Sequence, residues 1–363
     1  MQRKAILLLI WIGFMAVMSM IGNFKQEEVV CGQKVLRTKA LFAFIVFAPI
    51  IWMAANRGWF ADTTLYILNY LNMPDSLSQL PTYFATLTKD KGFYVLSFFL
   101  KLILGSGFKP YLFVLALFQG ISVVYFFRKY SSDYIISIFL FVASTDYLSW
   151  MFNGLRQFMA VTIILFATSY MLEKKYFPVV CAILLASTMH KSALLMIPFV
   201  FIAQGEPWNK KTLILIFIVL LAVGFTGEFT TLLDDSLSKT QYVNVVSDYQ
   251  SFNDDGTNPL RVLVYSVPAL LSLFGLRYIK NAHNPLINFC VNMSIISMGL
   301  YVISMVTSGI FIGRLPIYCS LFGYILLPWE IDYIFNEKSA ILIKIMMVLS
   351  YLAFYYYSLF MAA

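Results

Sequence analysis

Charged residues are scarce in this chain. Asp, Glu, Lys and Arg make up 12% of its 363 residues, whereas 60% of the residues are hydrophobic. A soluble domain carries about 25% charged residues, so this composition excludes an ordinary soluble protein. Apolar runs of about 18 residues or more recur along the chain, which predicts an integral membrane protein. These runs are continuous and do not alternate with polar residues, which argues against a membrane β-barrel.

Sequence motifs for metals, nucleotides and covalent hydrolysis are also missing. The cysteines have no zinc-type spacing, and we interpret them as apolar packing residues: Cys31, Cys181, Cys290 and Cys319. We find no P-loop, dinucleotide loop, serine-hydrolase elbow or Asp-x-Asp motif. The Asp pairs 234–235 and 254–255 are expected to be solvated. The sequence therefore predicts no metal and no cofactor, and it disfavours chemistry on cytoplasmic nucleotide sugars.

The apolar runs predict an all-α fold, a polytopic transmembrane bundle of about 11 or 12 helices. The expected spans are 5–22, 40–55, 110–127, 134–150, 154–172, 177–189, 192–203, 212–227, 259–276, 286–307, 314–329 and 340–360. Segment 93–104 is too short to cross and is expected to be interfacial or re-entrant. Arg3 and Lys4 precede the first run without a clear cleavage site, so we expect a retained helix. We interpret residues 1–363 as a single membrane domain.

Basic clusters predict the topology, because Lys and Arg concentrate on the cytoplasmic side of a membrane. This rule places four clusters on the cytoplasmic side, namely 128–129, 173–175, 209–211 and 277–280. All four clusters can lie on the cytoplasmic side if 177–203 is a helical hairpin, because an even number of crossings then separates each cluster from the next. The same arrangement places the basic linker 23–39 inside. The connections 56–108 and 228–258 then lie outside. The formal net charge of +8 is explained by these flanking cations, so no nucleic-acid partner is expected.

Several cations remain on the outer face, where the topology rule does not account for them. They are Arg57, Arg156, Arg261, Arg314 and Lys191, together with His190. A cation in the apolar layer costs roughly 2.5–3.5 kcal/mol on insertion scales, so such residues are functional candidates. Arginine also suits bidentate binding of phosphate or carboxylate.

Each candidate has a structural alternative. Arg57 could extend to the interface beside Trp52 and Trp59, Arg261 could anchor a helix start, and Arg156 could pair with Asp146. A histidine such as His190 can act as a general base or hold a phosphate, or it can be a satisfied structural group. An aromatic cluster could stack on sugars or form an interfacial belt: Trp52, Trp59, Phe60, Tyr66, Tyr70 and Tyr83.

One block of sequence resembles a known family. Arg156-Gln157 and Ala160, followed by Ala186-Ser187-Thr188-Met189-His190-Lys191-Ser192-Ala193-Leu194 and Pro198, resemble the EpsG family of Wzy-like polysaccharide polymerases. Arg57-Gly58 with Asp62 and Tyr66, and Arg314 with Pro316 and Tyr318, are similar to other segments of that family. Lys91-Gly92-Phe93-Tyr94 also matches, although the acid Asp90 stands one place earlier than in the family. The resemblance covers about residues 50–330.

The resemblance implies a GT-C-like, metal-independent glycosyltransferase at the outer face of the bacterial inner membrane. It would polymerise undecaprenyl-diphosphate-linked repeat units into O-antigen, capsule or exopolysaccharide, with a flippase and a chain-length regulator as partners. Catalytic roles fall to His190, Arg156 and Asp62. Substrate binding falls to Arg57, Arg314, Arg261, Lys191 and Tyr66.

Two other classes of protein compete with this interpretation. A flippase for the same lipid-linked sugars would also have many spans and a cationic cavity, but it should show two similar halves, and we find no internal repeat. A membrane O-acyltransferase would use an intramembrane histidine with a cytoplasmic acyl donor. The predicted topology places His190 on the opposite side from such a donor.

Overall fold

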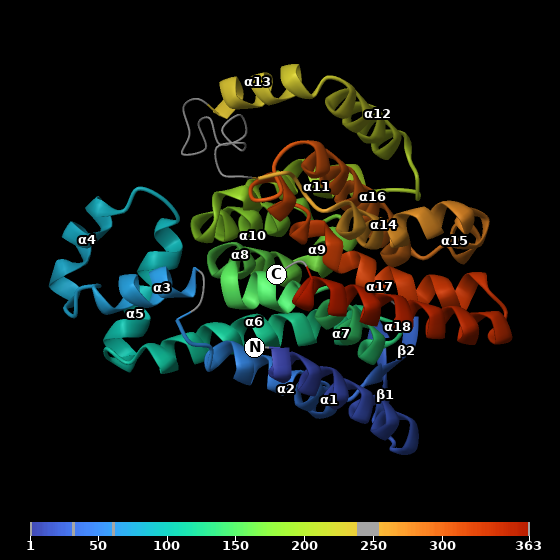
Figure 1. The fold of residues 1–363 in the computed structure, drawn as a ribbon, viewed down its shortest axis with the longest axis horizontal. Coiled ribbons are helices and arrows are strands. Elements are labelled where there is room, and N and C mark those ends of the chain that lie inside the picture. The colour runs from blue at the N-terminus through green and yellow to red at the C-terminus, as the bar shows by residue number, and fades with distance from the viewer. Residues whose placement is uncertain (1, 31–32, 60–61, 238–253, 362–363) are drawn as a thin grey trace. The chain divides into compact units, whose positions relative to one another are not determined.

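A computed structural model describes residues 2–30, 33–59, 62–237 and 254–361, and these residues are mostly helical. The chain divides into two compact units. Unit 1 comprises Met1–Leu194 and Ile341–Ala363, and unit 2 comprises Leu195–Ala340. Each unit is described by itself below, with helices and strands labelled as in Figure 1.

Long apolar helices confirm the prediction of an all-α, polytopic membrane protein. In the described residues four helices are long and apolar enough to cross a membrane: Arg3–Ile21, Phe108–Tyr130, Pro285–Val306 and Glu337–Phe360. The number rises to seven if three bent helix pairs each form one span. Four shorter apolar helices are Ala40–Ala55, Leu155–Phe166, Tyr176–Met189 and Lys191–Ala203. The sequence-based number of about 11 or 12 spans included these short helices, which fall below the length of a full crossing.

Unit 1 contains most of the helices of the N-terminal half. Its elements are α1 Gln2–Ile21, β1 Lys25–Val30, β2 Gln33–Thr38, α2 Ala40–Ala55, α3 Thr63–Leu71, η1 Leu77–Gln79, α4 Leu80–Thr86, α5 Lys91–Leu104, α6 Phe108–Tyr130, α7 Tyr134–Ala143, the π-helix η2 Tyr147–Asn153, α8 Leu155–Phe166, α9 Thr168–Leu172, α10 Tyr176–Met189, η3 Lys191–Leu195 and most of α18 Glu337–Phe360. Helix α6 packs against α2 and α8, and α10 packs along α8.

The contact between α2 and α6 requires a small residue on α6. A Cβ atom added at Gly120 would lie 2.4 Å from Ile51 Cγ1, so glycine permits the two helices to approach closely. The Tyr134 hydroxyl donates a hydrogen bond of 2.7 Å to the Ala43 carbonyl and links α7 to α2. These contacts hold α6 and α7 against α2.

The linker between α1 and α2 is a β-hairpin, which differs from the polar linker predicted for 23–39. Strands β1 and β2 pair antiparallel, with Lys25 opposite Thr38. Arg37 Nη1 donates a 2.6 Å hydrogen bond to the Ser131 carbonyl after α6. Arg128 forms an ion pair with Glu28 and donates to the Thr38 carbonyl at 2.7 Å. The hairpin therefore lies at the same end of α6 as Arg128, as the predicted topology requires.

Unit 2 contains α11 Met196–Ala203, α12 Lys210–Gly224, α13 Thr226–Leu237, α14 Pro259–Phe274, α15 Leu276–Ala282, α16 Pro285–Val306, η5 Ile312–Arg314 and α17 Ile317–Ile334. Helix α16 is buried over most of its length and packs against α11, α12, α14 and α17. The first part of the predicted connection 228–258 is helical: it lies in α13, which is bent by 107° from α12. Residues 238–253 of that segment lie outside the described residues, as do Cys31 and Phe60.

The prediction that the Asp pairs are solvated is wrong for two of the four carboxylates. Asp234 and Asp254 are buried, whereas Asp235 and Asp255 are exposed. Asp254 accepts hydrogen bonds from the Ser308 hydroxyl at 2.7 Å and from the main-chain N–H groups of Gly309, Ile310 and Gly256 at 3.0, 3.0 and 3.1 Å. This carboxylate therefore joins the segment before α14 to the break after α16.

Close backbone packing reinforces this junction. Gly256 has φ of +84°, and a Cβ atom there would lie 2.4 Å from the Met305 carbonyl oxygen. The Thr257 N–H donates to the Ser304 carbonyl at 2.9 Å, and the Ser304 hydroxyl donates to Thr257 Oγ1 at 2.8 Å. Only glycine fits at position 256, because both its φ and the available space exclude a side chain.

Replacing Asp254 with asparagine is expected to lower the free energy of unfolding by about 1.5–3 kcal/mol, because it weakens hydrogen bonds to a charged acceptor. Burial raises the pKa of Asp254, but the Ser308 hydroxyl and three N–H groups outweigh it and bring this pKa below 3.8. A depressed pKa stabilises the folded state above the unfolded pKa, and this contribution is lost as the pH falls through the folded value. The measurement is thermal unfolding of the detergent-solubilised protein at neutral pH and below pH 3.8.

Asp255→Asn is the matched control for this substitution, because Asp255 is the exposed neighbour. It should leave the unfolding midpoint unchanged. Equal midpoints for the Asp254 and Asp255 variants at neutral pH would contradict a stabilising role of the Asp254 junction.

Candidate functional site

Arg156 lies at the second residue of α8, directly after the π-helix and Gly154. Its Nη1 atom forms an ion pair with Asp90 Oδ2 at 2.7 Å. The Asp90 side chain is 2% exposed and the Arg156 side chain 21% exposed, so solvent can reach only the arginine. The alternative that Arg156 pairs with Asp146 is wrong, and Asp146 instead accepts from Trp150 Nε1 at 3.3 Å.

Asp90 is the site residue to which sequence reasoning gave no role. It has a left-handed backbone (φ 51°, ψ 39°) and immediately precedes α5. Lys191 lies near enough to its carboxyl group to lower the pKa of Asp90. Burial raises the pKa of Asp90, while Arg156, Lys89 and Lys191 oppose this effect. Its Oδ1 atom is buried and accepts no hydrogen bond from the part of the chain that the structure describes. Asp90 therefore links Arg156 to the segment that follows α10.

Aromatic rings surround the other faces of the Arg156 guanidinium. Its Cζ atom lies 5.7 Å from the centroid of Tyr66 and 5.9 Å from that of Tyr94, within the range of cation–π attraction. Tyr66 comes from α3 and is buried, with the ring of Phe93 against its edge at 5.8 Å. Burial raises the pKa of the Tyr66 hydroxyl, which keeps it protonated and able to donate a hydrogen bond.

The prediction that Arg57 could extend to the interface is wrong, because its side chain is buried. Its Nε atom donates to Thr63 Oγ1 at 3.0 Å, and its Nη1 atom donates to the carbonyls of Ala54 at 2.8 Å and Met151 at 2.9 Å. The Nη2 atom is buried and has no hydrogen-bond partner among the described residues. Burial lowers the pKa of Arg57 to about 10, so the guanidinium stays charged at neutral pH.

Asp62 is held by the residues at the end of the π-helix η2. Its N–H donates to Asn153 Oδ1 at 3.0 Å, and the neighbouring Thr63 hydroxyl donates to the Phe152 carbonyl at 2.8 Å. Asn153 ends the π-helix that precedes Arg156. The segment after α2 is thereby attached to the residues that lead into α8.

His190 and Lys191 directly follow the C-terminal end of α10. His190 is half-buried, its backbone is extended (φ −157°, ψ 123°), and its Nδ1 atom lies 2.7 Å from the Ser192 hydroxyl oxygen. Lys191 is exposed and starts η3. Asp90 contacts Arg156 and lies near Lys191, and α10 packs along α8, so the start of α8 and the end of α10 lie together. The short limb 177–189 thus returns the chain to the end of unit 1 that holds Arg156.

Gly92 brings α5 against α10 at this point. A Cβ atom at Gly92 would lie 2.2 Å from Thr188 Oγ1 and 3.0 Å from the Thr188 carbonyl carbon, so a side chain cannot fit without movement of α10. Asp90 stands two residues before Gly92, and His190 two residues after Thr188. The glycine in this motif therefore sets the distance between Asp90 and the His190 segment.

Gly92→Ala is expected to destabilise unit 1 by about 1–3 kcal/mol through overpacking. Thermal unfolding of the solubilised protein is the measurement. Gly58→Ala is the matched control, because no atom of the described residues lies within 4 Å of a Cβ atom at Gly58. A Gly92→Ala protein with wild-type stability would contradict the close approach of the two helices.

Arg261 and Arg314 belong to unit 2. Arg261 lies in the first turn of α14 and is half-buried, with its Cζ atom 5.9 Å from the Tyr265 ring centroid. Arg314 is exposed and ends η5. The Asp254 junction holds the start of α14 to the segment 308–310 before η5. It therefore gathers both arginines at one end of unit 2, while the remaining predicted site residues lie in unit 1.

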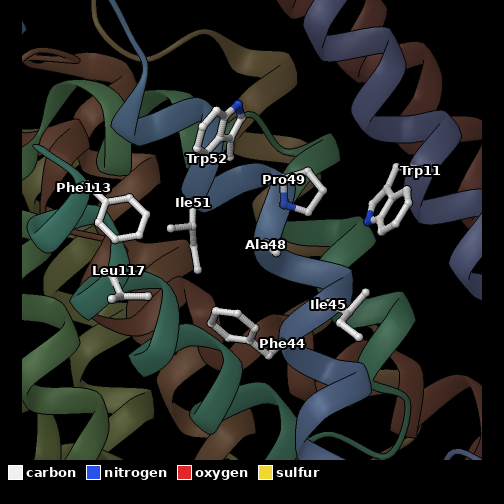
Figure 2. A pocket seen from close by; sticks show the side chains of 9 residues that line it. All are labelled: Trp11, Phe44, Ile45, Ala48, Pro49, Ile51, Trp52, Phe113 and Leu117. Atoms are coloured by element: carbon white, nitrogen blue, oxygen red, sulfur yellow. The ribbon is translucent and has the colours of Figure 1, made fainter. Parts of the chain in front are cut away.

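The aromatic cluster that could stack on sugars or form an interfacial belt divides into two groups. Tyr70 is fully buried and stacks on Tyr111 with ring centroids 4.1 Å apart, so it belongs to the core and the sugar-stacking interpretation is wrong for it. Trp52 and Trp59 are exposed. Trp52 also borders an apolar groove of about 550 Å³ between α1, α2 and α6, shown in Figure 2. Its lining has no polar surface, and it is formed by Trp11, Phe44, Ile45, Ala48, Pro49, Ile51, Trp52, Phe113 and Leu117. Such a groove suits hydrocarbon and offers no group for chemistry.

These features define a polytopic helical membrane protein in which a buried carboxylate, an arginine, a lysine and a histidine gather at one end of unit 1. The EpsG family model matches residues 40–363, and the chain belongs to the EpsG family. This family is related to the Wzy-like polysaccharide polymerases, so membership supports a general role in polysaccharide biosynthesis as a glycosyltransferase-like polymerase. No curated protein and no solved structure gave a significant match.

Proposed function

We propose that this protein polymerises undecaprenyl-diphosphate-linked oligosaccharide repeat units into O-antigen, capsule or exopolysaccharide at the outer face of a bacterial inner membrane. The observation that carries the proposal is the Arg156–Asp90 ion pair at the end of unit 1 that also holds His190 and Lys191. A diphosphate is a dianion or more, and a partly exposed arginine beside an exposed lysine suits it. Family membership supports the same class of chemistry.

In the proposed reaction, Arg156 and Lys191 bind the diphosphate of one lipid-linked glycan. A glycosidic bond forms between the acceptor hydroxyl oxygen and the anomeric carbon, while the bond from that carbon to the phosphate oxygen breaks. His190 takes the hydroxyl proton as general base, and its contact with Ser192 at 2.7 Å orients the ring. The leaving diphosphate gains negative charge, which the Arg156 guanidinium stabilises.

The remaining predicted residues have supporting roles in this proposal. Tyr66 lies over the guanidinium of Arg156 and offers a protonated hydroxyl to the substrate. Asp62, held by Asn153, is the alternative base. Arg57 braces the segment around Asp62 through its bonds to Thr63 and two carbonyls. Arg261 and Arg314 bind a lipid-linked glycan from unit 2. The donor is a lipid diphosphate, and the reaction uses no metal.

A deletion strain tests this function against transport of the same lipid-linked sugars. Loss of a polymerase leaves surface glycan that carries a single repeat unit. Loss of a flippase removes surface glycan altogether, because no unit reaches the outer face. We expect single-repeat glycan, restored to long chains by the wild-type gene. Complete absence of surface glycan would overturn the proposal in favour of a transporter. The proposed partners, a flippase and a chain-length regulator, should remain functional in that strain.

A further inference from the structure

The hairpin β1–β2 has two faces of different character. In antiparallel strands, residues directly opposite each other share a face. Glu28 and Arg37 lie on the inner face, where they bond to Arg128 and to the Ser131 carbonyl. The outer face carries Lys25, Glu27, Val29, Lys34 and Leu36, and all of these side chains are exposed. The contacts of the inner face attach the hairpin to the C-terminal end of α6 and leave the outer face exposed.

The outer face combines exposed apolar side chains with an excess of positive charge. Val29 is 68% and Leu36 60% exposed, on neighbouring strands of the same face. Two lysines, Lys25 and Lys34, share this face with a single acid, Glu27. Aliphatic side chains flanked by lysines are typical of protein segments that lie in the headgroup region of a membrane, where the aliphatic groups enter the lipid and the ammonium groups meet phosphate.

The connections of the hairpin place it close to the membrane. Helix α1, a candidate span, ends at Ile21, and the apolar helix α2 begins at Ala40. Only residues 22–24 and Lys39 separate the strands from these helices. The Lys39 N–H donates to the Phe24 carbonyl at 2.7 Å, which closes the base of the hairpin. The exposed apolar residues Met20 and Leu41 flank it on both helices.

We propose that the outer face of this hairpin binds anionic phospholipid headgroups, with Val29 and Leu36 in the interface and Lys25 and Lys34 on the phosphates. The inference is independent of the proposed polymerase activity, because the hairpin and the Arg156 site lie at opposite ends of α2: the hairpin precedes Ala40, whereas Arg57 and Asp62 follow Ala55. The occupant is a lipid surface. A protein partner on this face is the competing outcome of the test.

The test uses an environment-sensitive fluorophore on Leu36→Cys, in full-length protein reconstituted into nanodiscs. Cys31 and Cys181 are replaced by serine, while Cys290 and Cys319 are buried and can remain. One set of nanodiscs contains phosphatidylcholine alone, and the other contains phosphatidylcholine with phosphatidylglycerol. We expect a blue-shifted emission with phosphatidylglycerol and a several-fold stronger quenching by headgroup nitroxide lipids, because anionic lipid attracts the lysines. High salt should reduce both effects.

Gln26→Cys is the matched control, because Gln26 is exposed on the opposite face of the same hairpin. Its label should respond little to lipid composition or to the nitroxide. The double variant Lys25→Glu/Lys34→Glu should abolish the response of the Leu36 label to phosphatidylglycerol while its thermal unfolding stays unchanged. Equal water exposure of the labels at positions 26 and 36 in both lipids would overturn the proposal. A Leu36 label shielded only after addition of a membrane extract would also overturn it, in favour of a protein partner.

Discussion

Replacing Arg156 with alanine is expected to abolish long-chain glycan and to lower the rate of the purified enzyme at least about 10²–10³-fold, the usual effect of removing one stabiliser of developing charge. The substitution also leaves the Asp90 carboxylate buried without its ion-pair partner. Breaking such a pair costs about 3–5 kcal/mol when both charges are buried. Because the Arg156 side chain is 21% exposed, we expect the lower end of that range. Chain length on gels and thermal unfolding measure the two effects separately.

The double variant Arg156→Ala/Asp90→Asn separates catalysis from stability. Asparagine removes the unpaired charge at Asp90, so the double variant should recover much of the stability lost in Arg156→Ala but none of the activity. Arg156→Lys keeps the charge without the planar guanidinium and should retain only partial activity. Arg128→Ala, at the opposite end of α6, is the control for loss of an ion-paired arginine and should leave polymerisation intact. Recovery of full activity in the double variant would show that Arg156 acts only by neutralising Asp90.

Replacing His190 with alanine is expected to lower the polymerisation rate about 10²–10⁴-fold, the range for loss of a general base. Stability should change little, because His190 is half-buried at a helix end. The chain has two histidines, so His283→Ala is a natural control, and it should be fully active. The measurement is the initial rate of repeat-unit consumption by purified protein in nanodiscs.

Two further variants distinguish His190 as base from its competitors. Ser192→Ala removes the contact that orients the His190 ring. It should lower kcat to a value between those of the wild type and His190→Ala, with a smaller change in KM. Asp62→Asn tests the alternative base. If Asp62→Asn were inactive while His190→Ala kept wild-type rates, the base would be Asp62 and the role proposed for His190 would be wrong.

Helix positions were largely predictable from the sequence, because the signal for a membrane helix is local. The predicted run 40–55 coincides with α2, and 286–307 differs by one residue at each end from α16. The break at His190-Lys191 was also visible, because charge interrupts two apolar runs there. The hairpin was missed, although Val29-Val30 and Val35 are good strand residues, because a short polar stretch between two long helices is more often an irregular linker.

The partners of the site residues could not be predicted, because they depend on long-range contacts. Asp90 stands one place before the position where the family has its acid, and its left-handed backbone and the glycine contact at Gly92 are needed to bring it to Arg156. The burial of Asp254 was not predicted, because its four hydrogen-bond donors are not evident from the neighbouring sequence. Three belong to Ser308, Gly309 and Ile310, and the fourth is the Gly256 N–H of the local turn. Arg57 looked interfacial because the carbonyl of Met151 is far from it in sequence.

The most direct test of the central claim is an in vitro polymerisation assay. Purified protein in nanodiscs is given the lipid-diphosphate-linked repeat unit of its own host, and the products are separated by length. We predict a ladder of lengthening glycans from the wild-type protein and from His283→Ala. Arg156→Ala should give only the single unit, although the variant is folded in the nanodisc. A wild-type ladder from Arg156→Ala would contradict the assignment of the Arg156–Asp90 site as the place of polymerisation.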